Sequence, residues 1–486
     1  MNITSEPRIT LLEHHANEIR NHVCGRADQH ERAAWAFFRK FSDHWHTHGH
    51  VMSESARYVC VEVIPIPEEL ILHSSRVAIK IKTSRLAAMM RRAVDENLVI
   101  GFVHSHPNGL DKFSPVDDDN ELDLLRSLYN RNGESVELVA LLVTQDGEWR
   151  GRVRTWTTST NPADARHVVV IGHRISIYVP NYLLKEDAEQ FDRQSLAFGE
   201  AFTAKLRRLR IAVIGAGGTG SAVATLLVRL GVGELIIIDG DRIETSNLNR
   251  VHGSARKDAD KKKFKADIQR DYLNSLDLGS TVMAVTSWAD EYEGAEALRS
   301  ADVIFGCTDD HLGRQTLNRA AYFWIQPLFD VGLDASIDNN VTPPELRNLD
   351  TRVSIVIPGH GPCLRCQKVI DDKKAAAEEL HRRDPSEYSK LEKEAYVRGA
   401  GQRNPGVVTY TTLAACIALD EFTEKIQSYK KRKSTISNTW WLFVTESMRH
   451  LGRGSSVDCP FCATGKYLLG DERAGLLGRP SLQRKG

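Results

Sequence analysis

The sequence predicts an α/β protein, because short apolar runs alternate with segments of helical length in two parts of the chain. In the C-terminal part, the runs at 211–214, 235–238 and 303–305 have the uninterrupted apolar character of strands buried in a parallel sheet. In the N-terminal part, strand-like runs at 58–64 and 136–143 flank a stretch with helical spacing at 84–97, with Ser84 as its expected N-cap. We therefore expect two α/β units, the second with a mostly parallel sheet.

Length and composition limit the class of protein. The chain has 486 residues, enough for about three folding units. Lys+Arg and Asp+Glu both number 64, and this balance argues against a dedicated nucleic-acid or membrane-surface binder. Residues 1–18 lack the apolar core of a signal peptide, and the longest uncharged stretch, 211–228, holds glycines that predict a strand, a turn and a helix instead of a membrane span. We expect a cytoplasmic protein whose eight cysteines are thiols or metal ligands.

Changes in sequence texture suggest four segments. The stretch 155–162 is rich in turn formers and is read as part of a connector. Beyond the second unit's strands come a charged helical stretch at 371–394 and a more apolar helix at 407–426. The expected segments are an N-terminal extension (1–26), a first unit (27–150), a connector (151–185) and a second unit (186–486).

A pattern of metal ligands follows the buried strand predicted at 98–103. From His104 to Asp117 the sequence reads H-x-H-x7-S-x2-D. Residues i and i+2 of a strand point to the same side, so His104 and His106 can bind one ion, and Asp117 can supply a third ligand. Three ligands with an open fourth position are typical of a catalytic zinc site. Such a site needs a separate carboxylate to accept a proton, and Ser114 could donate a hydrogen bond to the oxyanion.

This spacing resembles the signature of the JAMM (JAB/MPN) metalloproteases at every required position. The resemblance implies a JAB/MPN-type α/β domain that hydrolyses an amide or isopeptide bond after the C-terminal glycine of a ubiquitin-like protein. It places the general base at the start of the first strand, where Glu31 precedes the apolar run at 33–38. Glu62, in the predicted second strand, is the alternative. The histidines at 44–50 are typical of a polar loop.

A second pattern predicts a nucleotide site. The strand at 210–214 breaks into a G-x-G-x-x-G turn and a helix, which lets the backbone approach a phosphate at a helix N-terminus. Asp239 ends the next strand, where an acidic residue binds ribose hydroxyls. The turn contains four glycines: Gly215, Gly217, Gly218 and Gly220. This motif alone fits a dinucleotide dehydrogenase equally well.

Residues 239–250, D-G-D-R-I-E-T-S-N-L-N-R, resemble the D-x-D and S-N-L-x-R pattern of the ThiF/MoeB/ubiquitin-activating superfamily. Lys265 matches its phosphate-binding lysine, with Lys263 as the alternative. Asp309 matches its magnesium-associated aspartate, although the first Asp of that segment is Gly306 here. The resemblance implies a Rossmann-like adenylating domain that uses ATP and Mg²⁺ and forms a homodimer, with Arg193 reaching the partner's active site. The remaining nucleotide-binding positions carried over are Asp241, Asn247, Asn249 and Arg250.

The expected chemistry is formation of an acyl-adenylate by attack of a C-terminal carboxylate on the α-phosphorus of ATP. Two anions must meet, so positive charge has to offset the repulsion in the transition state. The groups expected to supply it are Lys265, Arg250, Arg193 and magnesium held by Asp309.

Two CxxC pairs predict a structural zinc. Four thiolates close a tetrahedral site and leave no open position for catalysis. The ligands are Cys363, Cys366, Cys459 and Cys462. In the superfamily, members that form a thioester carry a cysteine in the loop after the first CxxC, but residues 367–406 contain none. Cys24, Cys60 and Cys416 are expected to be buried thiols.

Together these patterns predict a bifunctional enzyme that trims or deconjugates a ubiquitin-like protein and adenylylates its C-terminal glycine. One alternative is sulfur-carrier activation in thiamine, molybdopterin or cysteine biosynthesis. Another is a scaffold that binds a ubiquitin-like protein without catalysis. A conjugating-enzyme homologue is a further possible partner.

Overall fold

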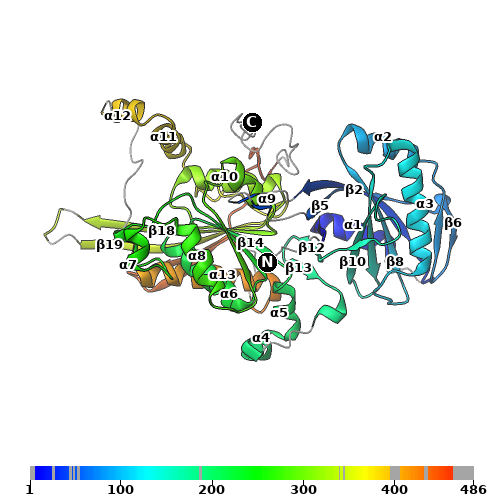
Figure 1. Ribbon diagram of the computed structural model, residues 1–486, viewed down its shortest axis with the longest axis horizontal. Coiled ribbons are helices and arrows are strands. Elements are labelled where there is room, and N and C mark those ends of the chain that lie inside the picture. The colour runs from blue at the N-terminus through cyan, green and yellow to red at the C-terminus, as the bar shows by residue number, and fades with distance from the viewer. Residues whose placement is uncertain are drawn as a thin grey trace.

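The computed structural model describes residues 6–24, 28–42, 46–47, 50–51, 55–184, 189–338, 340–342, 345–393, 406–431 and 436–463. Figure 1 shows two large sheets: the blue and cyan N-terminal residues form one, and the green to orange remainder forms the other. None of the helices in the described part of the chain is long and apolar enough to cross a membrane.

The N-terminal sheet has nine strands in the order β11-β10-β9-β8-β2-β5-β1-β12-β13. Its strands β8 and β9 are parallel, as are β5, β1 and β12, and the other pairs are antiparallel. The strands are β1 (Arg8–Leu12), β2 (Ala33–Ser42), β5 (Ala56–Pro65), β8 (Val99–His106), β9 (Glu137–Thr144), β10 (Trp149–Thr155), β11 (Ala163–Asp164), β12 (His167–Ile171) and β13 (Ile175–Tyr178). The sheet thus extends beyond the range 27–150 expected for the first unit.

Helices cover both faces of this sheet because its strands alternate their side chains between two cores. Phe38 and Val103 pack with α1 (Glu13–Val23) on one face. Phe37 and Phe102 pack on the other face with α2 (Leu86–Asp95) and α3 (Pro115–Asn132). Ser84 is not the N-cap of α2: a turn closed by Leu86 N–H on the carbonyl of Thr83 precedes the helix, so Arg85 takes that position without a side-chain cap.

Short elements complete the N-terminal half. The hairpin of β6 (Ile71–Ser74) and β7 (Ile79–Ile81) follows the 3₁₀ turn η1 (Glu68–Leu70). Within the predicted polar loop, β3 (His46–Thr47) pairs with β4 (His50–Val51). The side chains of the histidines at 44–50 lie outside the described residues.

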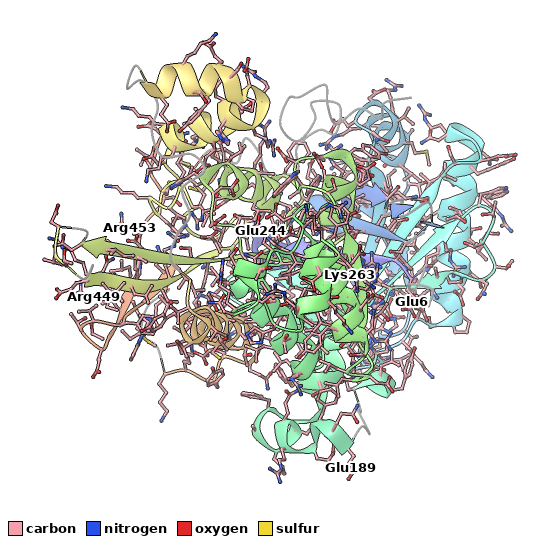
Figure 2. All side chains as sticks on the ribbon, turned by 60° about the vertical axis from the view of Figure 1, so that its left-hand side comes forward. Glu6, Glu189, Glu244, Lys263, Arg449 and Arg453 are labelled. Atoms are coloured by element: carbon pink, nitrogen blue, oxygen red, sulfur yellow. The ribbon has the colours of Figure 1, made fainter. Side chains whose placement is uncertain are left out.

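The C-terminal sheet has eight strands in the order β16-β15-β14-β17-β18-β19-β20-β21. It is parallel from β16 to β18, in line with the expected mostly parallel sheet, and antiparallel from β18 to β21, which makes it a mixed sheet. The strands are β14 (Arg210–Ile214), β15 (Glu234–Ile238), β16 (Thr281–Val285), β17 (Val303–Gly306), β18 (Leu328–Asp338), β19 (Glu345–Val356), β20 (Asn438–Leu442) and β21 (Ser447–Leu451). Figure 2 shows Arg449 of β21 and Glu6, near β1, on opposite sides of the molecule.

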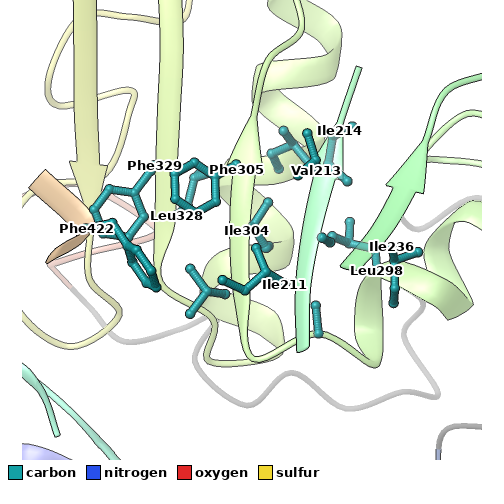
Figure 3. Close-up of a cluster of buried hydrophobic side chains, with 14 of the residues drawn as sticks. Ile211, Val213, Ile214, Ile236, Leu298, Ile304, Phe305, Leu328, Phe329 and Phe422 are labelled. Atoms are coloured by element: carbon teal, nitrogen blue, oxygen red, sulfur yellow. The ribbon is translucent and has the colours of Figure 1, made fainter. Parts of the chain in front are cut away.

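Helices pack on this sheet around a large apolar core. Phe422 of α13 stacks edge-on against Phe305 of β17 and Phe329 of β18 (Figure 3). The helices are α4 (Asp192–Phe198), α5 (Glu200–Leu206), α6 (Gly218–Leu230), α7 (Arg256–Asp260), α8 (Lys265–Asn274), α9 (Tyr292–Arg299), α10 (His311–Phe323), α11 (Asp372–Arg383), α12 (Pro385–Lys393) and α13 (Val408–Gln427). The 3₁₀ turns are η2 (Asn181–Leu183), η3 (Glu189–Phe191) and η4 (Thr245–Asn247).

The charged stretch predicted at 371–394 is two helices. Asp384 separates α11 from α12 and has extended dihedrals of φ −144° and ψ 84°. Its neighbour Pro385 disfavours helical geometry in the preceding residue, which explains the break.

The two sheets share one core and a set of buried ion pairs. Ile171, Ile175 and Ile177 of β12 and β13 belong to the same apolar cluster as the strands of the C-terminal sheet. Arg8 of β1 donates to Asp302 at 2.8 Å, and both side chains are at most 4% exposed. Loss of either partner would leave the other charge buried and uncompensated, so this contact between the sheets is costly to break from one side.

Candidate functional site

His104, His106 and Asp117 form a buried cluster at the carboxyl end of β8. The two histidines lie on the strand, and the first turn of α3 brings Asp117 to them. The two Nε2 atoms are 3.3 Å apart, and Asp117 oxygens lie 3.0 Å from His104 Nε2 and 3.3 Å from His106 Nε2. A tetrahedral zinc with ligands at its usual bond lengths has edges of about 3.3 Å. The three side chains therefore fit the metal that the sequence pattern predicts.

The surroundings of the cluster orient its ligands. His106 Nδ1 lies 2.9 Å from the carbonyl of Leu110, an arrangement that leaves Nε2 free for a metal. Burial disfavours the charge of Asp117, but hydrogen bonds from His104 and His106 outweigh it and hold the pKa of this carboxyl below its usual range.

Glu31 lies beside the cluster, and Glu62 does not. Glu31 Oε1 is 3.9 Å from His106 Nε2, its side chain is 1% exposed, and neither carboxylate oxygen has a hydrogen-bond partner among the described residues. Burial raises the pKa of Glu31 to about 7. Ser75, in the β6–β7 hairpin, holds its backbone. Glu62 instead forms a 2.6 Å ion pair with Arg92 and is 41% exposed.

Ser114 is the N-cap of α3. Its hydroxyl and its backbone N–H each donate to Asp117 Oδ2 at 2.7 Å. The Asp117 N–H donates back to Ser114 Oγ at 3.3 Å, which completes a capping box. In this structure the serine orients Asp117, and its role as an oxyanion donor stays a prediction.

Sequence reasoning missed the network that anchors α3. Glu121 of α3 is 1% exposed and accepts hydrogen bonds from Arg152 and Arg154 of β10. Arg152 also lies 3.9 Å from the centre of the Phe113 ring, whose centre is 6.0 Å from that of His104. This network carries no local motif because its partners are more than thirty residues apart in the chain.

A cavity of about 350 Å³ opens at the carboxyl ends of β14, β15 and β17. This edge of a parallel sheet is where such folds bind ligands. Most of the predicted nucleotide residues line it: Gly215, Gly217, Gly218, Asp239, Asp241, Asn247, Arg250, Lys265 and Asp309. Three predicted residues do not: Gly220, Asn249 and Arg193.

The glycine turn requires glycine at two positions. Gly215 has φ +90°, in the left-handed region. A Cβ at Gly220 would lie 1.7 Å from the carbonyl oxygen of Gly215, so this glycine permits the tight packing of α6 on the turn without lining the cavity. Asp239 is fully engaged with the backbone: its oxygens accept N–H bonds from Ala216 at 2.6 Å and Asp241 at 2.7 Å. Burial raises the pKa of Asp239 to about 6.

Lys265, and not Lys263, projects into the cavity. Lys265 Nζ lies 2.8 Å from Asp241 and its side chain is 13% exposed. Lys263, labelled in Figure 2, pairs with Asp258 at 2.9 Å and is 40% exposed. Arg250 lines the cavity. Its guanidinium donates to the carbonyl of Ser246 at 2.7 Å and to the side-chain oxygen of Asn249.

Arg193 is exposed on α4. It lies outside the cavity, and its action across subunits stays a prediction.

The cavity has a wall that the sequence did not indicate. Arg382 of α11 lines it and binds Asp290 at 3.0 Å. Glu378, one turn earlier, accepts the N–H of Leu312 at the start of α10. Trp288 also lines the cavity and packs over Gly240. The charged pattern of α11 predicted a helix but gave no signal of the contact between Arg382 and Asp290, which are 92 residues apart in the chain.

The four cysteines of the CxxC pairs meet as predicted. The sulfur atoms of Cys363 and Cys459 are 3.6 Å apart, and those of Cys366 and Cys462 are 3.5 Å apart. Tetrahedral zinc thiolates have sulfur–sulfur edges of about 3.8 Å, so this donor set fits a structural zinc. Of the other cysteines expected to be buried, Cys60 is buried, Cys24 is half-buried and Cys416 is exposed on α13. The apolar run around Cys416 misled the expectation because it covers only the other faces of that helix.

Comparison with known proteins assigns the C-terminal part of the chain. The model of the ThiF family matches residues 191–456, more than half of the chain. The chain belongs to the ThiF family. The match begins after the N-terminal sheet, so the unit that holds the histidine cluster lies outside it.

Curated relatives of this ThiF-family chain match between 30% and 38% of its length. They include "Adenylyltransferase and sulfurtransferase uba4" of Aspergillus clavatus, 32% identical over 30% of this chain and 30% of that protein, and its Aspergillus terreus counterpart, 32% identical over 38% and 37%. "Protein HesA, heterocyst" of Trichormus variabilis is 25% identical over 38% of this chain and 64% of that protein. The chain thus spans about a third of the length of the Aspergillus relatives. Among solved structures, E. coli MccB with ATP is 19% identical and covers 58% of this chain and 76% of that one, with a TM-score of 0.43.

Proposed function

We propose that this ThiF-family protein converts the C-terminal glycine of a small ubiquitin-like or sulfur-carrier protein into an acyl-adenylate. We assign to its N-terminal sheet a zinc-dependent peptidase that exposes or releases the same terminus. The observation that carries the first activity is the cavity in which the glycine turn, Lys265 and Asp309 meet. The second is supported by the convergence of two histidines and an aspartate beside the Glu31 carboxylate, which accepts no hydrogen bond from the residues that the structure describes.

In the adenylylation step, a carboxylate oxygen of the modifier attacks the α-phosphorus of ATP. The carboxylate oxygen forms a bond to the α-phosphorus. The bond between the α-phosphorus and the oxygen that bridges it to the β-phosphorus breaks, and pyrophosphate leaves. Lys265 and Arg250 line the cavity and would offset the charge of the meeting anions. Magnesium would bind through Asp309 and neutralise phosphate charge. In a homodimer, Arg193 of one copy would reach the cavity of the other.

In the peptidase step, His104, His106 and Asp117 would hold the zinc ion. Bound zinc supplies Lewis-acid activation of water and of the scissile carbonyl at neutral pH. Glu31 Oε1 would take a proton from water and deliver it to the departing amine, which its position 3.9 Å from His106 allows.

The two reactions are chemically consecutive. Hydrolysis of an amide after glycine leaves a free carboxylate, and adenylylation consumes a free carboxylate. This match supports assigning one class of substrate to both sites.

The segment where related enzymes carry a thioester-forming cysteine suggests what happens to the adenylate. Residues 367–406 contain no cysteine, so we assign the next step to a nucleophile from another protein. That protein would be a conjugating-enzyme homologue in protein modification, or a sulfur donor in cofactor synthesis. The names of the Aspergillus relatives, which join adenylyltransferase to sulfurtransferase, favour the sulfur-carrier version.

The deciding experiment is ATP–pyrophosphate exchange with the full chain, Mg²⁺ and candidate modifiers that end in glycine. Exchange that depends on the modifier, and that Asp309→Ala abolishes, would establish adenylylation. Exchange that is absent with every modifier while the modifiers still bind would instead indicate a scaffold without catalysis. Full exchange in Asp309→Ala would overturn the assignment of this residue.

A further inference from the structure

Glu31, the proposed proton acceptor, lies where the chain passes from the hairpin of β6 and β7 to strand β8. The residue after it, Arg32, exchanges two hydrogen bonds with Ser105, which lies between the two histidines on β8: the Ser105 N–H donates to the Arg32 carbonyl, and the Arg32 N–H donates to Ser105 Oγ, both at 3.0 Å. The Glu31 N–H instead donates to the carbonyl of Ser75 at 2.7 Å, and the Glu31 carbonyl accepts from the hydroxyl of Ser74 at 2.6 Å. Both backbone hydrogen-bonding groups of Glu31 are thus bonded to the hairpin.

The Glu31 side chain has no polar anchor of its own among the described residues. Its two carboxylate oxygens are buried without a hydrogen-bond partner there, and Oε1 lies 3.9 Å from His106 Nε2, which is beyond hydrogen-bond length. Packing and the backbone therefore decide where these oxygens lie. Because a displacement of about 1 Å can cost a reaction about 10²-fold in rate, the bonds that fix this backbone matter for catalysis.

Ser74 stands at the centre of a clamp that joins the hairpin to the chain around Glu31. Arg32 Nη1 donates to the Glu31 carbonyl at 3.1 Å and to Ser74 Oγ at 3.2 Å. The same guanidinium is held by Glu68, in η1 just before the hairpin, at 2.9 Å and by Asp28 at 2.8 Å. The Ser74 hydroxyl thus accepts from Arg32 while it donates to Glu31, so its loss would remove two bonds of the clamp.

The hairpin is not part of the sheet that carries the histidines. Strands β6 and β7 pair with each other and form a separate two-stranded sheet. Ile79 of β7 packs into the apolar core beneath the nine-stranded sheet, but such contacts are not directional. Hydrogen bonds such as the one from Ser74 therefore set how the hairpin presents the Glu31 backbone.

We propose that Ser74 is a positioning residue that fixes the Glu31 carboxylate relative to His104 and His106. It acts through the Glu31 carbonyl and takes no part in the chemical step. This inference rests on the proposed peptidase function, and it adds to that site a residue outside the H-x-H-x7-S-x2-D pattern.

The first test is hydrolysis of acetyl-Gly-Gly-aminomethylcoumarin, whose amide follows a glycine, by the full chain loaded with zinc. Ser74→Ala should lower kcat about tenfold, because the carboxylate loses its alignment, and should change KM less than about twofold. Ser74→Thr keeps a hydroxyl and should return kcat to within about twofold of the wild-type value. Zinc content should be the same in all of these proteins.

The matched control removes a different bond of the same hairpin. Lys82 Nζ donates to the carbonyl of Glu69 at 3.0 Å, and Lys82→Met abolishes this contact without touching Glu31. It should leave kcat within about twofold of wild type, as expected for an exposed surface change. Equal losses in Ser74→Ala and Lys82→Met would show that the hairpin matters only through its stability, against the proposal. An unchanged kcat in Ser74→Ala, or a Ser74→Thr protein as slow as Ser74→Ala, would also refute it.

The second test needs no catalysis and measures amide hydrogen exchange of the full chain, resolved to single residues by mass spectrometry. In Ser74→Ala the Glu31 N–H should exchange about fivefold or more faster than in wild type, because the local opening of its bond to Ser75 becomes easier. The amide of Phe37, within β2, should exchange at the wild-type rate. An unchanged rate at Glu31, or an equal rise at Phe37, would contradict a local positioning role.

The exchange measurement also separates this proposal from the peptidase assignment. If the wild-type chain cleaves no candidate substrate but Glu31 exchanges faster in Ser74→Ala, then Ser74 fixes this glutamate and the peptidase assignment fails. If cleavage is observed and neither kcat nor exchange responds to Ser74→Ala, the peptidase assignment stands and the role of Ser74 is refuted.

Discussion

The histidine cluster and the nucleotide cavity differ in how their polar groups are satisfied. At the cluster, the buried Glu31 carboxylate has no hydrogen-bond partner among the described residues, and three ligand atoms already stand at distances suited to a metal. In the cavity, Lys265 is paired with Asp241, Arg382 is paired with Asp290, and Asp239 is bonded to backbone. The first site would take up the proposed metal ion with little rearrangement, whereas the second would exchange internal bonds for the proposed phosphate contacts. The strand β8 and the helix α3 carry the ligands of the first site, whereas the glycine turn and α11 contribute to the second.

The largest expected effect is at the preorganised site. Glu31→Gln should reduce hydrolysis of a peptide bond after glycine by about 10²–10⁴-fold, because it removes the proposed proton acceptor. Zinc content, measured by mass spectrometry, should stay unchanged. Glu62→Gln is the matched control and should retain nearly full activity. Similar losses in both variants would contradict the assignment of Glu31.

The junction that holds both sites in place should show the next largest effect. Arg8→Met should lower the free energy of unfolding by about 3–5 kcal/mol, because it leaves the buried Asp302 without its 2.8 Å partner. Arg126→Met, which removes an exposed pair with Asp123, should cost less than about 1 kcal/mol. Denaturant titration of the two variants measures the difference, and equal costs would show that the buried pair does not matter.

Removal of one side chain from the nucleotide cavity should reduce activity less than removal of Glu31 from the proposed peptidase site. Lys265→Ala should reduce modifier-dependent ATP–pyrophosphate exchange by about 10²–10³-fold, because one cationic contact to phosphate is lost. The neighbouring Lys263→Ala removes an equal charge outside the cavity and should change the rate less than about twofold. A larger loss in Lys263→Ala would reverse the assignment of the two lysines.

Metal content should separate the two zinc sites. We expect two zinc ions per chain in the wild-type protein and one in Cys363→Ser, with a fall in melting temperature of about 5 °C or more, since the four thiolates tie β19 to the C-terminal segment. His104→Ala should also lose one ion, but with its loss confined to hydrolysis. Retention of both ions in Cys363→Ser would exclude the four-cysteine site.

The smallest effect concerns acid stability. Although burial opposes it, Arg8 and His167 hold the pKa of Asp302 below its usual range. An aspartate whose pKa is depressed in the folded state contributes stability above its unfolded pKa of about 3.9, and that contribution is lost as the pH falls further. Wild-type protein should therefore exceed Asp302→Asn in melting temperature at pH 7, and the gap should narrow below about pH 4. A gap independent of pH would contradict this account.

Local patterns predicted the central strands of both sheets and both clusters of candidate metal ligands. His104 and His106 share one strand face, and each CxxC pair lies within one turn, so spacing alone identifies them. Lys265 and Lys263 could not be separated by sequence, because a shift of two residues at a helix start decides which one enters the cavity. Contacts between distant elements, such as Arg382 with Asp290 and Arg152 with Glu121, have no short-range signal and required the fold.

The two sheets share an apolar core, and we expect them to unfold together. Because β12 and β13 share apolar side chains with the C-terminal sheet, separating the two halves would expose apolar surface on both. Heating should therefore produce one calorimetric peak for the whole chain and not two. A protease cut between β10 and β11 should leave a nicked protein whose fragments elute together, and the halves expressed separately should aggregate unless they are produced in the same cell.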